Sequence, residues 1–463
     1  MLKQIICLCG ILLSSLSLYG QDIHDFDYIR IPLKNSVVIG DILTLKPQSW
    51  DKLITIDEHP GIKKELTASV KDSLLIEINR ISQEYGKDSL RTPDIFYIFK
   101  PYFDWLRYID PHYRVQASYI ASSHDYKNQK ELKKAIKENV SYLPFDLICI
   151  NDTLLVNNSI DDLFKKGDII VSINGDDMKD VLKYNYSDRL TNPTILLENY
   201  FQHGLTDQFS VRILRDGHES TIKTQGKKSY HSVRVALAQM HATEKNLHVY
   251  GNIGYIPIPD FFSDNSRLIK IIRKAIEGYK KEGISDIILD LRNNPGGYGD
   301  RFDELLSIFI DRPEIPYMKS SKVMLSKKII DGEDLVRTIP LNNKRYISGM
   351  KYYILMNEGT GSIAASFCNI MQFNSAAILM GEALLHNALS YGEGIPVSDR
   401  YPNAVIPAIF KESRISSTYF DEYTKAVDNI LIPDYPISAN ASEYADGQDA
   451  ILYKAIEYIN GKN

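Results

Sequence analysis

Residues 284–297 read Ile-Ser-Asp-Ile-Ile-Leu-Asp-Leu-Arg-Asn-Asn-Pro-Gly-Gly, a short apolar run that stops at a proline and two glycines. A run this short, apolar at successive positions, is typical of a strand buried on both faces of a parallel sheet. Gly296 and Gly297 leave the backbone amides at the strand exit unobstructed by side chains. Unobstructed amides of this kind are what an oxyanion hole requires.

A second strand exit follows in residues 352–365, which read Tyr-Tyr-Ile-Leu-Met-Asn-Glu-Gly-Thr-Gly-Ser-Ile-Ala-Ala. The apolar run gives way through two glycines to a helical pattern, and Ser362 stands in the first turn of the helix. A hydroxyl there lies close to free backbone amides and to the positive end of the helix dipole, and both favour a developing negative charge. A serine at a helix start is usually only a cap, and Pro-Gly-Gly alone is usually a turn. Because both motifs occur in this chain and each follows a strand, a catalytic role is favoured over a simple cap and a simple turn.

Strand and helix patterns alternate from about residue 248 onward. This alternation predicts an α/β (α+β) fold with a mixed, at least partly parallel sheet and flanking helices. The predicted strands are 249–256, 284–291, 352–356 and 376–380, and the predicted helices are 266–282, 302–310 and 362–373.

Residues 143–226 are predicted to form a separate, small β-rich domain. The run 167–175, Gly-Asp-Ile-Ile-Val-Ser-Ile-Asn-Gly, has the composition of a strand that ends in a turn, and 208–214 with 219–223 predicts a hairpin around Asp216-Gly217. The 167–175 run resembles the strand and turn of PDZ-like domains, which add an extended peptide to a sheet edge. The peptide-carboxylate loop of that family is not recognisable in this sequence.

The chain of 463 residues exceeds the size at which one hydrophobic core keeps growing, so several domains are expected. Lys3 precedes an apolar run from Ile5 to Leu18, whose length suits a cleaved export signal better than a membrane span, with an uncleaved anchor as the alternative. The predicted division is 1–20 signal peptide, 21–142 N-terminal helical and mixed domain, 143–226 PDZ-like domain and 227–463 catalytic core. Within 21–142, the patterns predict helices at 62–84 and 94–108 and a strand at 113–120.

Composition excludes several functions. A net charge of -5 and a pI near 6.1 argue against nucleic acid as a partner. No stretch after the signal is apolar for long enough to span a membrane, and no spacing predicts a metal, a nucleotide or another cofactor. Cys149 and Cys368 do not form a disulfide framework, and Cys368 fits an inert buried thiol. Nothing in the sequence indicates the oligomeric state.

The chain resembles the S41 peptidases, the family of C-terminal processing proteases and tricorn-type core domains. This resemblance implies that Ser362 is the nucleophile and that the amides of a glycine of the Gly296-Gly297 pair and of Ile363 form the oxyanion hole. The matching motifs are Gly254 to Ile258 with Phe261, Asp290 to Gly297, Gly361 to Ala365, Gly381-Glu382, Tyr391 to Glu393 and Pro433-Asp434.

A serine nucleophile needs a neighbouring base. One branch of the family uses a lysine after Gly-Glu, and residues 381–387, Gly-Glu-Ala-Leu-Leu-His-Asn, contain none. The tricorn branch uses a histidine in an Asp-x-His context, which Asp110-Pro111-His112 matches, so the resemblance implies that His112 is the general base. His386 is the competing candidate.

An acidic residue is expected to orient the imidazole. Glu393 is the preferred candidate for this role, and Glu382 and Asp110 stay open. Asp290 and Arg292, at a buried strand end, are predicted to form a structural ion pair or a helix cap.

The sequence therefore predicts an exported serine endopeptidase or C-terminal processing protease, periplasmic or extracellular, that acts on polypeptides. The alternative is a catalytically inactive peptide- or ligand-binding protein on the same scaffold, because the lysine is missing and Ser390 stands where relatives often place a histidine. A hydrolase of non-peptide esters is a third interpretation.

Overall fold

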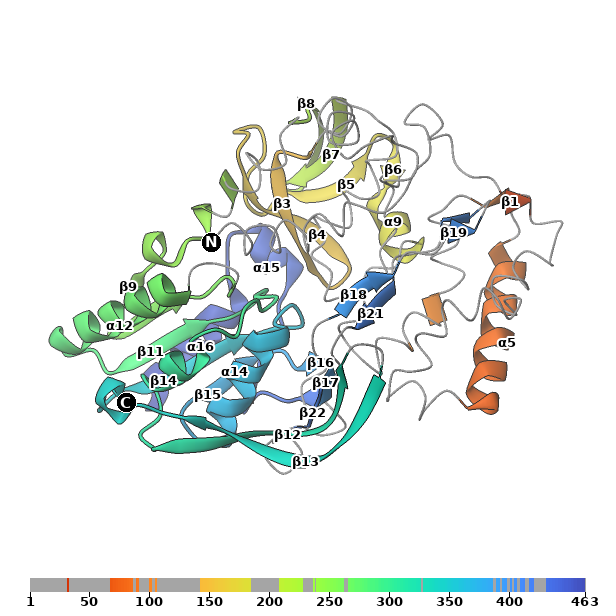
Figure 1. Ribbon diagram of the computed structural model, residues 1–463. Helices are drawn as coiled ribbons and strands as arrows, with labels where there is room; N and C mark the ends of the chain where they lie inside the picture. The colour runs from red at the N-terminus through yellow and green to blue at the C-terminus, as the bar shows by residue number, and fades with distance from the viewer. Residues whose placement is uncertain are drawn as a thin grey trace.

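The computed structural model describes residues 31–32, 67–85, 89–90, 100–101, 105, 142–184, 208–227, 236–237, 239–261, 265–325, 328–385, 389–391, 394–397, 400–401, 404–405, 409–412, 416–419 and 430–462, and structural statements below concern these residues. Elements carry the labels of Figure 1. The signal peptide expected at 1–20, the helix expected at 94–108 apart from 100–101 and 105, and the strand expected at 113–120 lie outside the described residues.

A mixed sheet forms the centre of the C-terminal half, in the order β24-β15-β14-β11-β10-β9. Neighbouring strands from β24 to β10 are parallel, and only the edge strand β9 is antiparallel. Their bounds are β9 His248–Tyr250, β10 Ile253–Pro257, β11 Asp286–Asp290, β14 Lys351–Met356, β15 Ile378–Gly381 and β24 Tyr435–Pro436.

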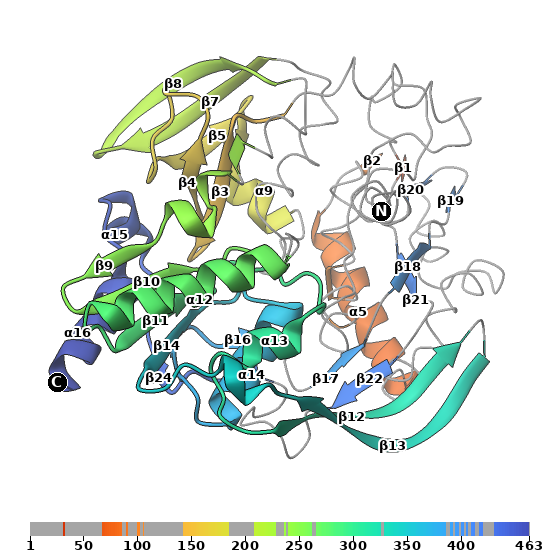
Figure 2. The ribbon, with the colours of Figure 1, turned by 60° about the vertical axis from the view of Figure 1, so that its left-hand side comes forward.

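Helices cover both faces of this sheet. In β11, Ile287 and Leu289 pack into the core cluster that includes three helices, whereas Ile288 packs with the helix on the opposite face. The first face carries α12 (Asn265–Lys281), α13 (Phe302–Leu306) and α14 (Ser362–Phe373), and the second carries α16 (Ala450–Lys462). Figure 2 shows α12 and α16 on the two sides of the strands. The predicted α/β class is confirmed, and burial of both faces explains why the strands read as continuous apolar runs.

Apolar residues three or four positions apart give α12 its buried face: Leu268, Ile272, Ile276 and Tyr279. The ring of Tyr279 packs directly on β10, where a Cβ added at Gly254 would lie 2.5 Å from Tyr279 Cδ2. The prediction of a single strand at 249–256 is wrong, because two strands, β9 and β10, occupy this region. The chain reverses at Gly251, which has φ +62°, so that β9 and β10 form an antiparallel hairpin.

Residues 142–227 form a second, β-rich unit with its own core, which includes Phe145, Leu154, Ile173 and Val211. Its sheet has the order β3-β4-β5-β7-β8, with β6 paired to β5. The elements are β3 Phe145–Ile150, β4 Thr153–Ser159, β5 Ile169–Ile173, β6 Asp176–Asp177, α9 Met178–Tyr184, β7 Gln208–Arg215 and β8 His218–Gln225. The hairpin predicted around Asp216-Gly217 is confirmed as β7 and β8.

This unit docks on the central domain through α15 (Ala441–Ala445), which lies beside β4 in Figure 1. Tyr444 donates its hydroxyl hydrogen to Asn157 Oδ1 over 2.9 Å. Gly167 approaches so closely that an added Cβ would lie 2.7 Å from the carbonyl oxygen of Ala445. The two units therefore share a packed interface.

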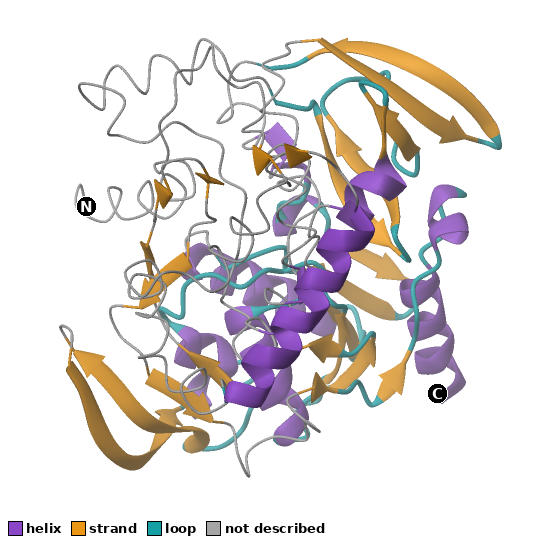
Figure 3. Ribbon diagram, turned by 90° about the vertical axis from the view of Figure 1, so that its right-hand side faces the viewer, coloured by secondary structure: helices purple, strands orange, loops and turns teal. Residues whose placement is uncertain are grey.

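The described residues also form further helices and strands, and Figure 3 colours all elements by type. The longest strands, β12 (Glu314–Leu325) and β13 (Lys328–Pro340), form a hairpin that the sequence patterns did not predict, joined by β22 (Ser416–Tyr419) and β17 (Leu389–Tyr391). The others are β1 Ile31–Pro32, α5 Ala68–Tyr85, β2 Ser89–Leu90, η2 Thr243–Lys245, η3 Asn343–Arg345, β16 Leu384–Leu385, β18 Gly394–Val397, β19 Arg400–Tyr401, β20 Ala404–Val405, β21 Ile409–Glu412 and β23 Ile430–Leu431.

Candidate active site

Two neighbouring strands deliver the two predicted motifs to the same edge of the sheet. Strands β11 and β14 are parallel, with Asp290 opposite Leu355. The pairing continues past the strand end, because the Leu291 amide donates to the Leu355 carbonyl over 2.9 Å. Carboxyl ends of neighbouring parallel strands meet at one edge, where open α/β sheets place their ligand sites.

Ser362 is the first residue of α14 and has φ +50°, in the left-handed region that a side chain rarely occupies. The preceding residue, Gly361, is extended, so the chain turns sharply from strand to helix at the serine. The side chain of Ser362 is exposed, whereas Ala364 and Ala365 behind it are buried. A left-handed residue costs about 1–2 kcal/mol, and such strain gathers at functional sites. The strand–turn–helix arrangement resembles the sharp turn called a nucleophile elbow in α/β hydrolases.

The Pro-Gly-Gly turn packs on this serine. Gly296 has φ +96° and Gly297 has φ +143°. A Cβ added at Gly296 would lie 2.6 Å from Ser362 Cβ and 3.0 Å from the Ile363 nitrogen. Only a glycine fits at position 296, for backbone angle and for space alike. The structure thus brings Gly296, Ser362 and Ile363 into contact, although position 296 is far from the serine in the chain.

The two glycine amides have different surroundings. The Gly296 amide donates to Asn294 Oδ1 over 2.9 Å. On either side of Gly297, the Gly296 carbonyl accepts from the Phe261 amide over 2.8 Å and the Tyr298 amide donates to the Phe261 carbonyl over 2.9 Å. Within the described parts of the chain, neither the Gly297 amide nor the Ile363 amide donates a hydrogen bond. The Ile363 amide belongs to the first turn of α14, where helix amides lack an intrahelical partner.

A set of polar residues clamps the two strand exits together. Buried Thr360 donates its hydroxyl hydrogen to the Leu291 carbonyl over 2.8 Å. Asn357 accepts from the Asn293 amide over 2.7 Å and donates to Asn293 Oδ1 over 2.9 Å. The Gly361 amide donates to the carbonyl of Asn294 over 2.8 Å. Sequence reasoning missed these roles; the available signal was the concentration of asparagine and threonine at both exits, residue types that bond to loop backbone.

An ion-pair network lies just before the glycine turn. Arg292 bonds to Asp290 over 2.6 Å and to Asp449 over 2.6 Å, and Tyr255 donates to Asp290 over 2.7 Å. Burial opposes ionisation of Asp449, but the Arg292 charge and its hydrogen bonds outweigh burial and hold the pKa of Asp449 below its ordinary value. Burial, then the Asp290 charge, raises the pKa of Tyr255. The predicted structural ion pair is confirmed, and it also ties α16 to the strand exit.

The predicted general base and most candidates for the orienting acid are not among the described residues. His112, Asp110, His386 and Glu393 lie outside the described residues. Glu382 accepts the Ala439 amide at Oε1 over 2.9 Å, while its own amide donates to the Met356 carbonyl over 3.1 Å. Its carboxylate therefore braces the chain that follows β24.

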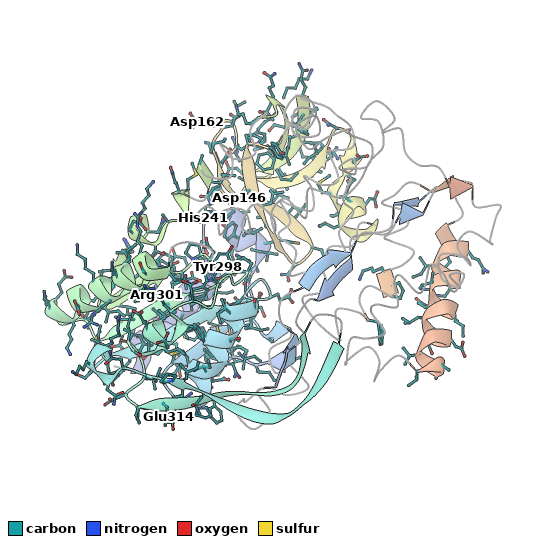
Figure 4. All side chains as sticks on the ribbon, viewed as in Figure 1. Asp146, Asp162, His241, Tyr298, Arg301 and Glu314 are labelled. Atoms are coloured by element: carbon teal, nitrogen blue, oxygen red, sulfur yellow. The ribbon has the colours of Figure 1, made fainter. Side chains whose placement is uncertain are left out.

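A histidine–carboxylate pair that sequence reasoning did not identify links the β-rich unit to the segment that follows it. His241 Nε2 is 2.8 Å from Asp146 Oδ2 and 2.7 Å from Asn158 Nδ2, and Figure 4 shows the labelled His241 and Asp146 beside each other. Tyr298 and Arg301 lie below them in that view, on the central domain. Asp146 and Asn158 belong to β3 and β4, so this pair secures the segment that joins the two units.

Among the residues described, no group of His, Cys, Asp and Glu could hold a metal ion. In the same residues no helix is long and apolar enough to cross a membrane. Cys368 is fully buried, as predicted, and burial raises the pKa of its thiol.

Residues 252–412 match the model of peptidase family S41, and this range contains both strand exits and Ser362. This part of the chain is therefore similar to peptidase family S41. A protein of Staphylococcus haemolyticus with the name "Probable CtpA-like serine protease" is 28% identical over 192 residues, which are 41% of this chain and 35% of the relative. A protein of the same name from Staphylococcus epidermidis is 32% identical over 165 residues, 35% of this chain and 30% of the relative. The chain therefore spans about a third of the length of these curated relatives.

Among solved structures, a crystal structure of a CPAF mutant superposes with a TM-score of 0.54 and 13% identity, covering 89% of this chain and 95% of that chain. Mature CPAF complexed with lactacystin superposes with a TM-score of 0.53 and 12% identity, covering 92% and 98%. At such identities these likenesses show a common fold.

Proposed function

We propose that this chain is a member of peptidase family S41, an exported serine endopeptidase or C-terminal processing protease that hydrolyses peptide bonds through an acyl-enzyme on Ser362. The observation that carries the proposal is the packing of the Gly296 turn on a strained, exposed serine at the start of α14. A serine that only caps a helix needs neither the left-handed angle nor a glycine turn against its Cβ.

In this proposal the amides of Gly297 and Ile363 supply the oxyanion hole beside Ser362. As Ser362 Oγ forms its bond to the substrate carbonyl carbon, the carbonyl oxygen takes the negative charge and these amides donate to it. Donors fixed before the reaction stabilise that charge without reorganisation, and removal of one such donor costs about 100-fold to 1,000-fold in kcat.

His112 is the proposed general base, and Glu393 the group that orients its imidazole. His112 takes the Ser362 hydroxyl proton during attack and gives it to the leaving amine when the peptide bond breaks. Water, deprotonated by the same imidazole, then attacks the acyl-enzyme and releases the carboxylate product with Ser362 restored. His386 is the competitor as base, and Asp110 the competitor as orienting acid. The bond from Glu382 to the Ala439 amide favours a bracing role for Glu382.

The substrates in this proposal are polypeptides, and the site of action is the periplasm or the exterior of the cell. The relatives named CtpA-like serine proteases support a protein substrate, and the N-terminal apolar run supports export. The β-rich unit at 142–227 is proposed to be PDZ-like, on the basis of its 167–175 turn.

A serine-directed fluorophosphonate tests the proposal on the full chain. We expect labelling of the wild type, none of Ser362→Ala, and labelling slowed by about 100-fold or more in His112→Ala. His386→Ala is the matched control and is expected to label at the wild-type rate. If folded wild type is not labelled, the peptidase proposal is wrong, and the non-catalytic binding protein takes its place. A panel of peptides and simple esters then separates a peptidase from an esterase.

A further inference from the structure

Asn294 connects three segments of the candidate active site through hydrogen bonds. Its side chain is fully buried, with 0% exposure. Its Nδ2 donates to the Ile258 carbonyl over 2.8 Å, and its Oδ1 accepts the Gly296 amide over 2.9 Å. Its own carbonyl accepts the Gly361 amide over 2.8 Å. One residue thus touches the end of β10, the glycine turn and the residue before the serine.

The hydrogen bond from the Gly296 amide to Asn294 determines which of the two glycine amides is available to bind an oxyanion. Gly296 and Gly297 are adjacent, and either amide could in principle face an oxyanion. Because Asn294 Oδ1 already accepts the Gly296 amide, that amide points into the protein. The Gly297 amide carries no such bond among the described residues, and the Phe261 bridge fixes the peptides on both sides of it.

The Nδ2 bond makes this choice rigid. The Ile258 carbonyl that accepts from Asn294 belongs to a residue whose amide donates to the Asp290 carbonyl over 2.8 Å. The amide group of Asn294 is therefore held at both of its ends, so it cannot rotate to release Gly296 without breaking a buried hydrogen bond. Rotation would leave a buried polar group without a partner, and that loss opposes it.

We propose that Asn294 is a positioning residue that selects the Gly297 amide as oxyanion donor and holds it in register with the Ile363 amide. This inference rests on the proposed function, because it assigns a role within the same active site. In this role Asn294 touches no reacting atom. It acts through the glycine turn, on the transition state alone, so its loss is expected to lower kcat and to leave KM nearly unchanged.

Gln372 offers a matched control for the loss of a buried side-chain amide. It is also buried, and its Nε2 donates to a backbone carbonyl, that of Ile432, over 3.0 Å. It lies in the last part of α14, about 15 Å along the helix from Ser362 at 1.5 Å per residue. Gln372→Ala removes a comparable interaction without contact to the glycine turn.

The experiment measures fluorophosphonate labelling rate, kcat and KM for a cleaved peptide, and circular dichroism, on full-length wild type and variants. For Asn294→Ala we expect labelling and kcat to fall by about 100-fold, as for a lost oxyanion donor, with KM within about threefold. Gln372→Ala is expected to keep the wild-type labelling rate. A folded Asn294→Ala that labels within threefold of Gln372→Ala overturns the inference.

Asn294→Asp gives a second, pH-resolved test and decides the matter if Asn294→Ala does not fold. When neutral, the new carboxyl can donate to Ile258 and accept from Gly296, as the amide does; when ionised, it faces the Ile258 carbonyl with a like charge. Because burial raises the pKa of a carboxyl, its ionisation is expected between about pH 6 and 9. The ratio of variant to wild-type kcat should therefore fall as pH rises through that range, while the dichroism stays that of folded protein. A ratio that is independent of pH and close to one overturns the inference.

The two proposals fail in different ways. If the wild type labels and the Asn294 variants label equally fast, only the positioning role is wrong. If the wild type itself does not label, the proposed function fails and the role of Asn294 in it falls as well.

Discussion

Gly296 lies with its backbone against the Cβ of Ser362, so close that a Cβ added at Gly296 would be 2.6 Å from it. The same added atom would be 2.8 Å from the Gly361 carbonyl oxygen and 3.0 Å from the Ile363 nitrogen. The glycine turn and the helix start therefore form one packed unit, and neither can shift without the other. Because real Cβ contacts do not occur below about 3 Å, this relationship makes a sharp prediction about side-chain size.

Gly296→Ala is expected to abolish labelling at Ser362 and to destabilise the protein by at least about 2 kcal/mol. The left-handed φ of +96° costs an alanine about 1–2 kcal/mol, and the overlap with the helix start adds a similar amount. Labelling rate and denaturant unfolding measure the two effects.

Gly299→Ala is the control from the same turn. A Cβ at Gly299 would meet only Ile363 Cδ1, at the ordinary distance of 3.7 Å, and the φ of Gly299 lies outside the left-handed region. We expect a stability change within about 0.5 kcal/mol. Equal losses in the two variants would show that the turn is merely intolerant of substitution.

The left-handed backbone of Ser362 predicts a difference between two inactive variants. Ser362→Ala keeps the cost of φ +50°, whereas Ser362→Gly relieves it, so the glycine variant is expected to be more stable by about 1 kcal/mol. Neither variant has a nucleophile, so neither should label. Denaturant midpoints at equal slopes measure the difference. An alanine variant at least as stable as the glycine variant would show that the serine carries no backbone strain.

Local patterns were sufficient to predict the elements that position the serine. The helix predicted at 362–373 coincides with α14, because two glycines mark its start and its apolar period is regular. The apolar runs at 284–291 and 352–356 likewise predicted the buried strands β11 and β14. The turn at Gly251 was missed although Gly251-Asn252 is a hairpin signal, because the flanking residues are apolar enough to read as one strand.

The partners of the site were not predictable, because they depend on contacts between distant segments. Asn293 and Asn357 are 64 residues apart, and Arg292 and Asp449 are 157 apart. Such pairs are set by the order of strands in the sheet, which no local pattern contains. The contact of Gly296 with Ser362 has the same origin, since it follows from β11 and β14 being neighbours.

The Arg292 network predicts a loss of stability in acid. The pKa of Asp449 is lower in the folded protein than its ordinary value, so its contribution is present above the unfolded pKa of about 4 and is lost as pH falls through the folded value. Asp449→Asn is expected to lower the free energy of unfolding at neutral pH, and this difference should shrink steadily below about pH 4. A difference between variant and wild type that stays constant with pH would contradict the coupling.

Removal of the cation tests the same network from the other side. The side chains of Arg292 and Asp290 are 16% and 8% exposed, so Arg292→Ala leaves carboxylates without their partner in a poorly solvated place. Breaking a buried pair in this way costs about 3–5 kcal/mol. Arg273→Ala provides the control, because Arg273 pairs with Glu277 on the surface of α12, where such pairs contribute little. Comparable losses in both variants would contradict a special role for the Arg292 network.

Two glycines with nearly the same backbone angle test the docking of the β-rich unit on α15. Gly167 has φ +92° and would place a Cβ 2.7 Å from the Ala445 carbonyl oxygen, whereas Gly175 has φ +90° and nothing within 4 Å. Both alanine variants bear the same backbone cost, so their difference reports packing between the units alone. We expect Gly167→Ala to be less stable than Gly175→Ala by about 1–3 kcal/mol, as for an overpacked core, measured by denaturant unfolding.

Tyr444→Phe removes the hydrogen bond to Asn157 and tests the same interface. We expect it to lower the free energy of unfolding by about 1 kcal/mol in the wild type and by less in Gly167→Ala, because the docking that Tyr444 supports is already disturbed there. If the losses of stability from Gly167→Ala and Tyr444→Phe were strictly additive, the contacts of Gly167 and Tyr444 would be independent and would not form one interface.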